Sequence, residues 1–392
     1  MSANASRVTI VGGGLAGLTA AIECAEAEAP VTLMEAHDAV GGRARSTEGP
    51  YKANLGPHAI YKDGGLWRWL AERDLLPPSA HAPLAGFRFR WEGAVRRMPP
   101  LGAVPSVLRL RGREAPVDES FRAWATRHTD GRTAAMLSAA AGVYTFHHDP
   151  GELSAAFVWP RNVRVFLTPP PAARYPIGGW STLVAALARR AQDLGVDIQT
   201  GHSVDELPDR PVILAVELAQ ARRLLGDETL TWPSGNTVCL DLALRQRRGD
   251  PFIVCDLDEA GWVERFTAAD SSLAPEGEEL IQAQMPIRPA ESADQACLRL
   301  EGLLDLSIPD WRARETWRRR LLMDGRTGAL DMPGTSWQDR PAIDRGDGVY
   351  VAGDMMAAPG MLGEVAWASA AQASKLALQT ARVTPLRPSR AA

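Results

Sequence analysis

The residues that decide the fold read RVTIVGGGLAG at positions 7–17. The first five are strand-forming, a glycine-rich turn follows, and residues 18–29 carry Ala, Leu and Glu at helical spacing. A second strand-like run, VTLME, occupies residues 31–35. The order strand, glycine-rich turn, helix, strand predicts one βαβ unit of a Rossmann-type domain.

The glycines of this turn have the spacing G-x-G-x-x-G, and each has a separate physical task. Gly12 permits the tight turn, Gly14 lets a pyrophosphate approach the backbone, and Gly17 lets the helix pack close to the strand. The N–H groups of Leu15 and Ala16, at the helix N-terminus, would face the phosphates. The sequence therefore predicts a dinucleotide site at this turn.

An acid ends the second strand, where the ribose of a bound adenosine would lie. The carboxylate of Glu35 would bind the ribose hydroxyls, and Ala36 would line the same place. A free ribose is favoured over a ribose with a 2′-phosphate, because the acid would repel the phosphate. The acid alone does not distinguish FAD from NAD.

The distinction comes from Gly41, Gly42 and Arg43, which follow Glu35 closely. An acid followed by Gly-Gly-Arg resembles the large FAD family that includes amine oxidases, protoporphyrinogen oxidases and phytoene-type desaturases. The resemblance implies that the backbone of Gly42 and the guanidinium of Arg43 contact the FAD pyrophosphate. The chemistry agrees, because a guanidinium fork can neutralise a buried diphosphate and glycine lets the diphosphate approach.

A second part of the same resemblance lies near the C-terminus, where VYVAGD occupies residues 349–354 and PGMLGEVA occupies residues 359–366. The family has a strand that ends in Ala-Gly-Asp, which implies that Gly353 and Asp354 bind the ribityl or phosphate region. A helix expected over residues 364–382 would begin beneath the flavin and stabilise negative charge on its reduced form. The residues implied to contact the cofactor there are Met361, Leu362, Gly363 and Val365.

Two shorter segments complete the predicted site. Gly56, Pro57 and His58 match a family segment that passes close to the isoalloxazine ring. His58 is the catalytic candidate, because imidazole titrates near neutral pH and can act as a general acid or base. The alternative is a histidine that only packs or hydrogen-bonds beside the ring. Residues 202–204 and 212–215 resemble a strand pair whose valine, here Val204, meets the adenine.

The chain departs from amine oxidases in two ways. Many of these enzymes hold a water near the flavin with a lysine from the middle of the chain, but no lysine occurs here between Lys62 and Lys375. An arginine or a bare site would have to substitute. The cysteine that tethers flavin in some monoamine oxidases is absent from residues 354–358, so FAD should be non-covalent. His147 and His148 lack a third ligand at useful spacing, so no metal is expected.

Composition argues against several other classes of protein. The net charge of -4 and the pI of about 6.0 give no reason to expect nucleic-acid binding. The four cysteines lie far apart, which favours a reducing compartment, the cytoplasm, over a disulfide framework. Residues 1–6 are too short and polar for a signal peptide, and no apolar run reaches the roughly 18 residues of a membrane helix. Membrane contact is expected to be peripheral at most. The basic residues 109–113 are expected to form a solvated surface loop.

The chain of 392 residues is long enough for two interleaved domains. The expected fold class is α/β: a Rossmann-type FAD-binding domain with a discontinuous substrate domain made of a mixed β-sheet and a helical cap. The FAD-binding domain is assigned to residues 1–80, 172–235 and 335–384. The substrate domain is assigned to residues 81–171 and 236–334, and residues 385–392 are expected to be a disordered tail.

The resemblance implies a FAD-dependent oxidoreductase that removes a hydride from a small organic substrate and creates a C=C or C=N bond. The substrate can be apolar. The electron acceptor stays open among oxygen, a quinone and other acceptors. Two alternatives also stay open. One is a flavin-dependent isomerase or cyclase without net redox, and the other is a flavin-binding protein without turnover.

Overall fold

The computed structural model of the chain describes residues 6–56, 59–83 and 85–383. One part of it is a five-stranded sheet in the order β15-β9-β1-β2-β8, and every neighbouring pair in it is parallel. The strands are β1 (Val8–Val11), β2 (Val31–Met34), β8 (Asp197–Gln199), β9 (Val212–Leu214) and β15 (Val349–Val351). Distant segments of the chain thus share one parallel sheet, which confirms the predicted Rossmann-type architecture.

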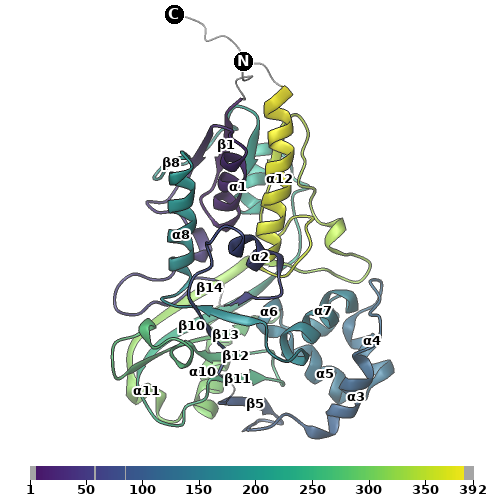
Figure 1. Ribbon diagram of the computed structural model, residues 1–392. Helices are drawn as coiled ribbons and strands as arrows, with labels where there is room; N and C mark the ends of the chain where they lie inside the picture. The colour runs from purple at the N-terminus through teal and green to yellow at the C-terminus, as the bar shows by residue number, and fades with distance from the viewer. Residues whose placement is uncertain (1–5, 57–58, 84, 384–392) are drawn as a thin grey trace, which may run out of the picture.

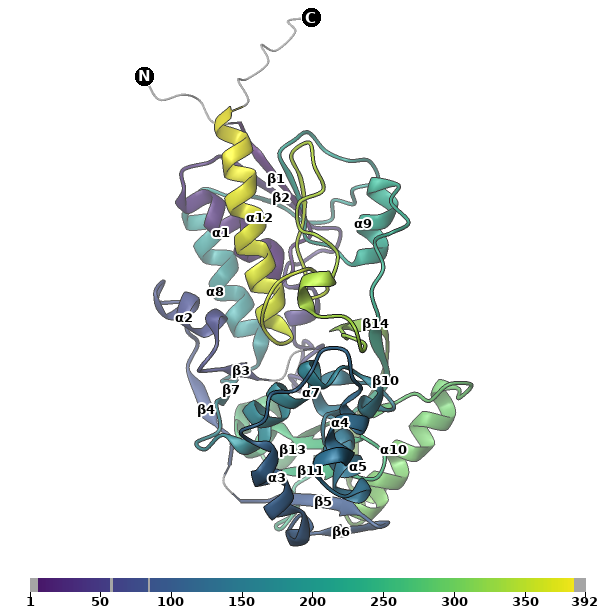
Figure 2. The same ribbon diagram turned by 90° about the vertical axis from the view of Figure 1, so that its right-hand side faces the viewer.

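Helices α1, α8 and α12 lie side by side along this sheet, and α9 lies apart from them (Figures 1 and 2). Their bounds are α1 (Leu15–Glu26), α8 (Trp180–Asp193), α9 (Leu218–Leu225) and α12 (Gly363–Val383), and the short α2 (Gly65–Ala71) packs on α12. The side chains between the layers, such as Ile10, Leu18 and Leu33, are fully buried. Nearly continuous apolar strands of this kind are typical of a parallel sheet that is covered by helices.

The second large sheet has seven strands in the order β14-β10-β13-β12-β11-β5-β6. It is mixed, because β11 pairs with β5 in parallel while its other pairs are antiparallel. The strands are β5 (Phe87–Trp91), β6 (Ala94–Arg96), β10 (Ser234–Arg245), β11 (Ile253–Asp256), β12 (Trp262–Arg265), β13 (Glu278–Pro286) and β14 (Glu315–Ala329). Strands β5 and β6 are joined by a tight turn at residues 92–93 and form a hairpin.

Helix α10 (Ala293–Ser307) covers one face of the mixed sheet, and α11 (Trp311–Arg314) leads into β14. The predicted helical cap is also present, beside the sheet (Figure 2). It consists of α3 (Val104–Leu110), α4 (Phe121–His128), α5 (Gly131–Ala140), α6 (Gly142–Thr145) and α7 (Ala155–Asn162), and a π-helical turn, Val163–Leu167, ends it. The core of the cap is built around Phe121, Trp124 and Trp159, three large side chains that are almost fully buried.

A small three-stranded sheet lies where the chain enters and leaves the cap. Its order is β3-β7-β4, with bounds β3 (Ile60–Tyr61), β4 (Ser79–His81) and β7 (Ala173–Pro176). Within the described ranges, no helix combines the length and the apolar character that a membrane crossing requires. The predicted tail, residues 385–392, lies outside the described residues.

One expected strand is wrong. Residues 202–204 were expected to pair with residues 212–215, but β8 ends at Gln199, and only the second segment forms a strand, β9. Gly201 has a φ of +67°, a left-handed conformation that turns the chain out of the sheet. The chain then passes beside Glu35, whose carbonyl oxygen accepts a hydrogen bond of 2.8 Å from the N–H of His202.

Candidate functional site

The glycine-rich turn has the geometry that its sequence predicts. Gly12 has a φ of +101°, and a Cβ atom at Gly17 would lie 1.8 Å from the carbonyl oxygen of Gly12. Both positions therefore exclude a side chain. A Cβ at Gly14, in contrast, would meet nothing within 4 Å. Helix α1 begins at Leu15 with no side-chain cap and no acid in its first turn, so its N-terminal N–H groups and positive dipole end face this open space.

Glu35 lies directly against the same turn. One carboxylate oxygen accepts a 2.7 Å hydrogen bond from the N–H of Gly13, and the other accepts from the backbone N–H of His37 at 2.9 Å and contacts its ring Nδ1 at 2.7 Å. Burial raises the pKa of Glu35, but the hydrogen bonds from His37 and Gly13 outweigh it, so the pKa is lower than usual. The carboxylate is therefore ionised at neutral pH. Ala36, the next residue, is exposed beside it.

The two distant motifs of the predicted site meet at an ion pair. The guanidinium of Arg43 forms a bidentate contact with the carboxylate of Asp354, at 2.8 and 3.0 Å, and also donates to the carbonyl of Arg326. The Arg43 side chain keeps 37% of its accessible surface. Gly42, the preceding residue, lies close to the glycine-rich turn, with its Cβ position 3.4 Å from Gly14 Cα.

The start of α12 lies beside the start of α1. A Cβ at Gly363 would be 3.4 Å from the side chain of Leu15, and the preceding residue, Leu362, has a φ of +54°. Gly353 is held to the same helix, because its N–H donates to Ser369 Oγ at 2.9 Å. Two helix N-termini thus converge on the Arg43–Asp354 pair, and their dipoles favour a negatively charged group there.

The remaining predicted residues fall into three groups. Gly56 packs on Arg43, with its Cβ position 3.1 Å from the Arg43 carbonyl oxygen. Met361 is buried with the core of the cap, and Val365 is buried in the core of the parallel sheet. Val204 is partly buried and packs against that same core. The catalytic candidate His58 and its neighbour Pro57 lie outside the described residues.

The mixed sheet presents a polar face that was not predicted. Along β10, residues 238, 240, 242 and 244 enter the apolar core under α10, while Thr237, Cys239 and Asp241 alternate onto the other face. Gln282 and Gln284 on β13 follow the same alternation. This period of two was visible in TVCLDLAL and LIQAQM, and it is the signal that could have located the face.

Asp241 anchors a buried network on this face. Its carboxylate accepts from Nε of Arg319 on β14 at 2.8 Å and from Gln282 Nε2 at 2.9 Å. Burial raises the pKa of Asp241, although Arg319 and Gln282 oppose the shift. Gln282 also exchanges two hydrogen bonds with the backbone of Asn54, so the network holds the segment that leads to Gly56.

A second buried carboxyl on this face, that of Glu264, forms no ion pair with any described residue. Glu264 accepts from Tyr175 OH at 2.5 Å and from Trp262 Nε1 at 3.0 Å. Burial raises the pKa of Glu264, and the two hydrogen bonds only partly offset the shift. Burial also raises the pKa of the Cys239 thiol, to about 12. A thiol of this kind is a poor candidate for attachment to a flavin.

Charged residues join the cap to the start of α12. Arg164 binds both carboxylate oxygens of Glu364 at 2.6 and 2.8 Å and also binds Asp63. Arg161 donates to the carbonyl of Gly360 at 3.0 Å, and it forms no ion pair with any described residue. Burial, together with other arginines, lowers the pKa of Arg161 to about 10. None of these cap residues was singled out from the sequence, because each depends on a partner far away in the chain.

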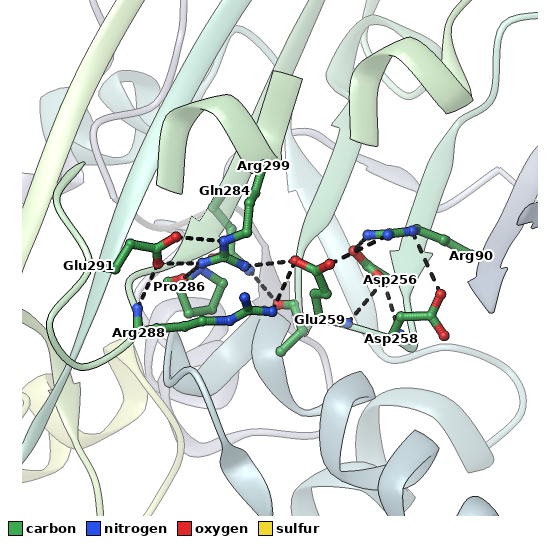
Figure 3. Close-up of polar contacts among 10 residues, drawn as sticks. Arg90, Asp256, Asp258, Glu259, Gln284, Pro286, Arg288, Glu291 and Arg299 are labelled. Carbon is green, nitrogen blue, oxygen red and sulfur yellow. Dashed lines mark hydrogen bonds and ion pairs between the residues drawn. The ribbon is translucent and has the colours of Figure 1, made fainter. Parts of the chain in front are cut away.

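A different cluster of charged residues links strands β5 and β11 of the mixed sheet to helix α10 (Figure 3). Arg90 binds Asp256 at 2.8 Å, and Arg299 binds Glu259 at 2.8 Å and Glu291 at 2.7 Å. A surface pocket of about 370 Å³ lies beside it, lined in part by Arg299 and residues 288–291. Each of these arginines already has an acid partner, so the cluster joins strands to helix α10 and offers no free cation.

No group of His, Cys, Asp and Glu suited to a metal occurs among the described residues. The described cysteines are all free thiols, and no lysine lies on the mixed sheet. Arg319 is the cation of the polar face, but its guanidinium is engaged by Asp241. These features together define an α/β protein that combines a Rossmann-type glycine-rich turn with a mixed sheet that has a polar face and with a helical cap.

Comparison with known proteins agrees with this class. Residues 10–73 match the family model of the NAD(P)-binding Rossmann-like domain. The chain is 41% identical over 70 residues to an L-amino-acid oxidase of Siganus canaliculatus and 49% identical over 57 residues to one of Crotalus adamanteus. These matches cover 17% and 14% of this chain, and only 13% and 11% of the length of the two relatives.

Solved structures match nearly the whole chain. An oxidoreductase from Methanosarcina mazei has a TM-score of 0.77 at 16% identity, over 94% of this chain and 100% of that one. Cyclohexylamine oxidase from Brevibacterium oxydans has a TM-score of 0.68 at 14% identity, over 96% and 99%. Such identities establish the fold alone. Together, the matches confirm the predicted resemblance to the superfamily that contains the FAD-dependent amine oxidases.

Proposed function

We propose that the protein is a FAD-dependent oxidoreductase that binds its cofactor non-covalently and removes a hydride from a small organic molecule. The observation that carries the proposal is the convergence of an uncapped α1, the N-terminus of α12 and the Arg43–Asp354 pair on one open space. A buried diphosphate needs this combination of free N–H groups, positive dipole ends and a guanidinium.

The residues present fit FAD. Gly14 leaves room for the pyrophosphate, Arg43 and Asp354 would hold its charged and ribityl parts, and Glu35 would accept from the ribose hydroxyls. The start of α12, at Gly363, would meet the flavin edge that becomes negative on reduction. When bound, FAD supplies the hydride acceptor, and the chain supplies position and electrostatics.

The residues of the chain would act mainly by orienting the substrate and excluding water. In this proposal, the cap and the polar face of the mixed sheet would enclose the region in front of the flavin. Residues 1–80, 172–235 and 335–384 would form the FAD-binding domain. The Asp241 network would hold the segment around Asn54 that leads to the catalytic candidate His58. Cys239 stays protonated at neutral pH, which supports a non-covalent flavin.

The experiment is anaerobic reduction of the FAD-loaded protein by panels of amines, amino acids, alcohols and saturated ketones. The proposal expects at least one class to bleach the flavin absorption and to lose two hydrogens by mass. A substrate that is converted without change of mass would instead show an isomerase. Flavin that stays oxidised with every class, but is reduced at once by dithionite, would contradict hydride removal from these substrates.

A further inference from the structure

The first turn of α12 contains an acid, Glu364, whose side chain is only 9% exposed. Its Oε2 atom accepts a hydrogen bond of 3.1 Å from the N–H of Met361, so it satisfies a donor just before this helix. The carboxylate is also enclosed by the loop before α2, because a Cβ atom at Gly64 would lie 1.7 Å from Oε1. Glu364 is therefore held at the end of α12 where the proposed function needs a positive helix dipole.

A cation from the cap meets this carboxylate. Arg164 lies in the π-helical turn that ends the cap, and its two Nη atoms contact the two carboxylate oxygens of Glu364 at 2.6 and 2.8 Å. The same guanidinium donates from Nε to Asp63 at 3.1 Å and lies over the ring of Tyr61, with its Cζ atom 4.6 Å from the ring centroid. Figures 1 and 2 show α7, which leads into this turn, near the end of α12 at which that helix begins. The guanidinium of Arg164 is thus fixed beside α12 by contacts on several sides.

The charges around the start of α12 balance only when Arg164 is present. Arg161 and Arg164 are the cations there, and Glu364 and Asp63 are the acids. The ion pair at the predicted pyrophosphate site is neutral in itself. Asp63 is 48% exposed, so water screens its charge, whereas Glu364 is enclosed by protein. Without Arg164, the start of α12 would carry a buried negative charge that no direct partner neutralises.

We propose that Arg164 is a positioning residue for the reduction of FAD, because it neutralises Glu364 and so lets the start of α12 stabilise reduced flavin. This inference rests on the proposed function, which places the flavin edge at this helix end. Reduction by a hydride leaves a negative charge on the flavin, and a lone carboxylate beside it would oppose that charge and cancel the helix dipole. With Arg164 bound, Glu364 can join α12 to the cap without this opposition.

An ion pair that only fastens the cap to α12 is the alternative, and the two roles predict different results. A fastening role predicts that loss of either partner lowers stability and leaves the equilibrium between oxidised and reduced FAD unchanged. The electrostatic role predicts opposite shifts. Glu364→Gln leaves Arg164 bound to Asp63 and adds net positive charge, so the reduction potential should rise. Arg164→Met leaves Glu364 without its cation, so the potential should fall.

The test is the reduction potential of the FAD-loaded protein, measured by anaerobic equilibration with a reference dye. Arg164→Met should weaken the binding of reduced FAD, relative to oxidised FAD, by about tenfold, which lowers a two-electron potential by about 30 mV. Glu364→Gln should raise the potential by a similar amount, about 30 mV. The double variant Arg164→Met, Glu364→Gln should return close to the potential of the unchanged protein, because both charges are then absent.

A matched control lies elsewhere in the cap. Arg127 on α4 pairs with Glu119 and is 59% exposed, so Arg127→Met makes the same change of net charge and should leave the potential unchanged. Thermal melts without FAD show which variants fold. Glu364→Gln keeps the contact between Arg164 and Asp63, so it tests the proposal even if Arg164→Met does not fold.

Two results would overturn the proposal, and they can be told apart. If the unchanged protein binds FAD, but the potential moves in neither variant or in the same direction in both, this inference fails and the proposed function stands. If the unchanged protein binds no FAD, the proposed function fails and this inference fails with it.

Discussion

The glycine-rich turn and the polar face of the mixed sheet are fixed by different kinds of interaction. In the glycine-rich turn the constraint comes from the backbone, because Gly12 has a left-handed φ and a side chain at Gly17 would overlap a carbonyl oxygen. On the sheet each polar group is fixed by a partner from another element, as Asp241 is by Arg319. The first kind of constraint appears in a sequence as glycines at set spacing, and the second appears only after folding.

The largest expected effect is on the polar face. Changing Arg319 to Met leaves the carboxylate of Asp241 buried at 1% exposure without its cation, which should lower the free energy of unfolding by about 3–5 kcal/mol. Urea unfolding at neutral pH measures the loss. The double variant Arg319→Met, Asp241→Asn should recover most of it, because no unpaired charge then remains. A single variant that costs under about 1 kcal/mol would show that this pair does not hold the sheet.

The next effect is on the predicted binding of FAD. Changing Arg43 to Gln removes the charged donor from the predicted pyrophosphate site, and FAD affinity should fall by roughly 10- to 100-fold. Unfolding of the protein without FAD should change by less than about 1 kcal/mol, because the Arg43 side chain is 37% exposed. Titration calorimetry measures the affinity for FAD, and thermal melts measure the stability of the protein without FAD. Unchanged affinity for FAD would place the diphosphate elsewhere.

Two glycines at the start of α1 give a sharper contrast. Gly17→Ala creates a backbone overlap and should destabilise the protein by about 1–3 kcal/mol or more. Gly14→Ala meets open space and should cost at most about 1 kcal/mol, as a poorer N-cap, while it weakens FAD binding. Melting curves with and without FAD check both variants. Equal destabilisation by the two would contradict separate tasks for the two glycines.

The smallest effect is the pH dependence set by Glu264. Its pKa is raised by burial above its ordinary value of 4.5, so between these two pKa values the folded protein binds more protons than the unfolded chain. Its contribution to stability is therefore fully present below pH 4.5 and is lost as the pH rises, by at most about 1.4 kcal/mol per pH unit. Glu264→Gln should flatten this part of the profile. The same slope in both proteins would assign the titration to another group.

The sequence predicted the elements whose signals are local. The βαβ unit of residues 7–35 and the C-terminal strand at residues 349–351 lie where their patterns indicated, and the expected helical cap is present. The union of Arg43 with Asp354 was also predictable, because two motifs of one resemblance imply one site. The expected strand at residues 202–204 failed because Gly201 turns the chain away.

The rest of the site could not be predicted, because its charges are set by distant partners. Glu364 sits at the start of α12, where an acid alone would oppose negative charge on a flavin, but Arg164 from the cap neutralises it. The sequence shows both residues and does not show that they meet.

The most direct test of the account is the visible absorption spectrum of the purified protein, repeated on the supernatant after acid precipitation. The account predicts flavin bands in the native protein that move into the supernatant, with FAD identified there by mass. Absence of flavin, even after incubation with FAD, would contradict the central claim that the two helix N-termini and the Arg43–Asp354 pair form a FAD site. Flavin that stays in the precipitate would contradict non-covalent binding.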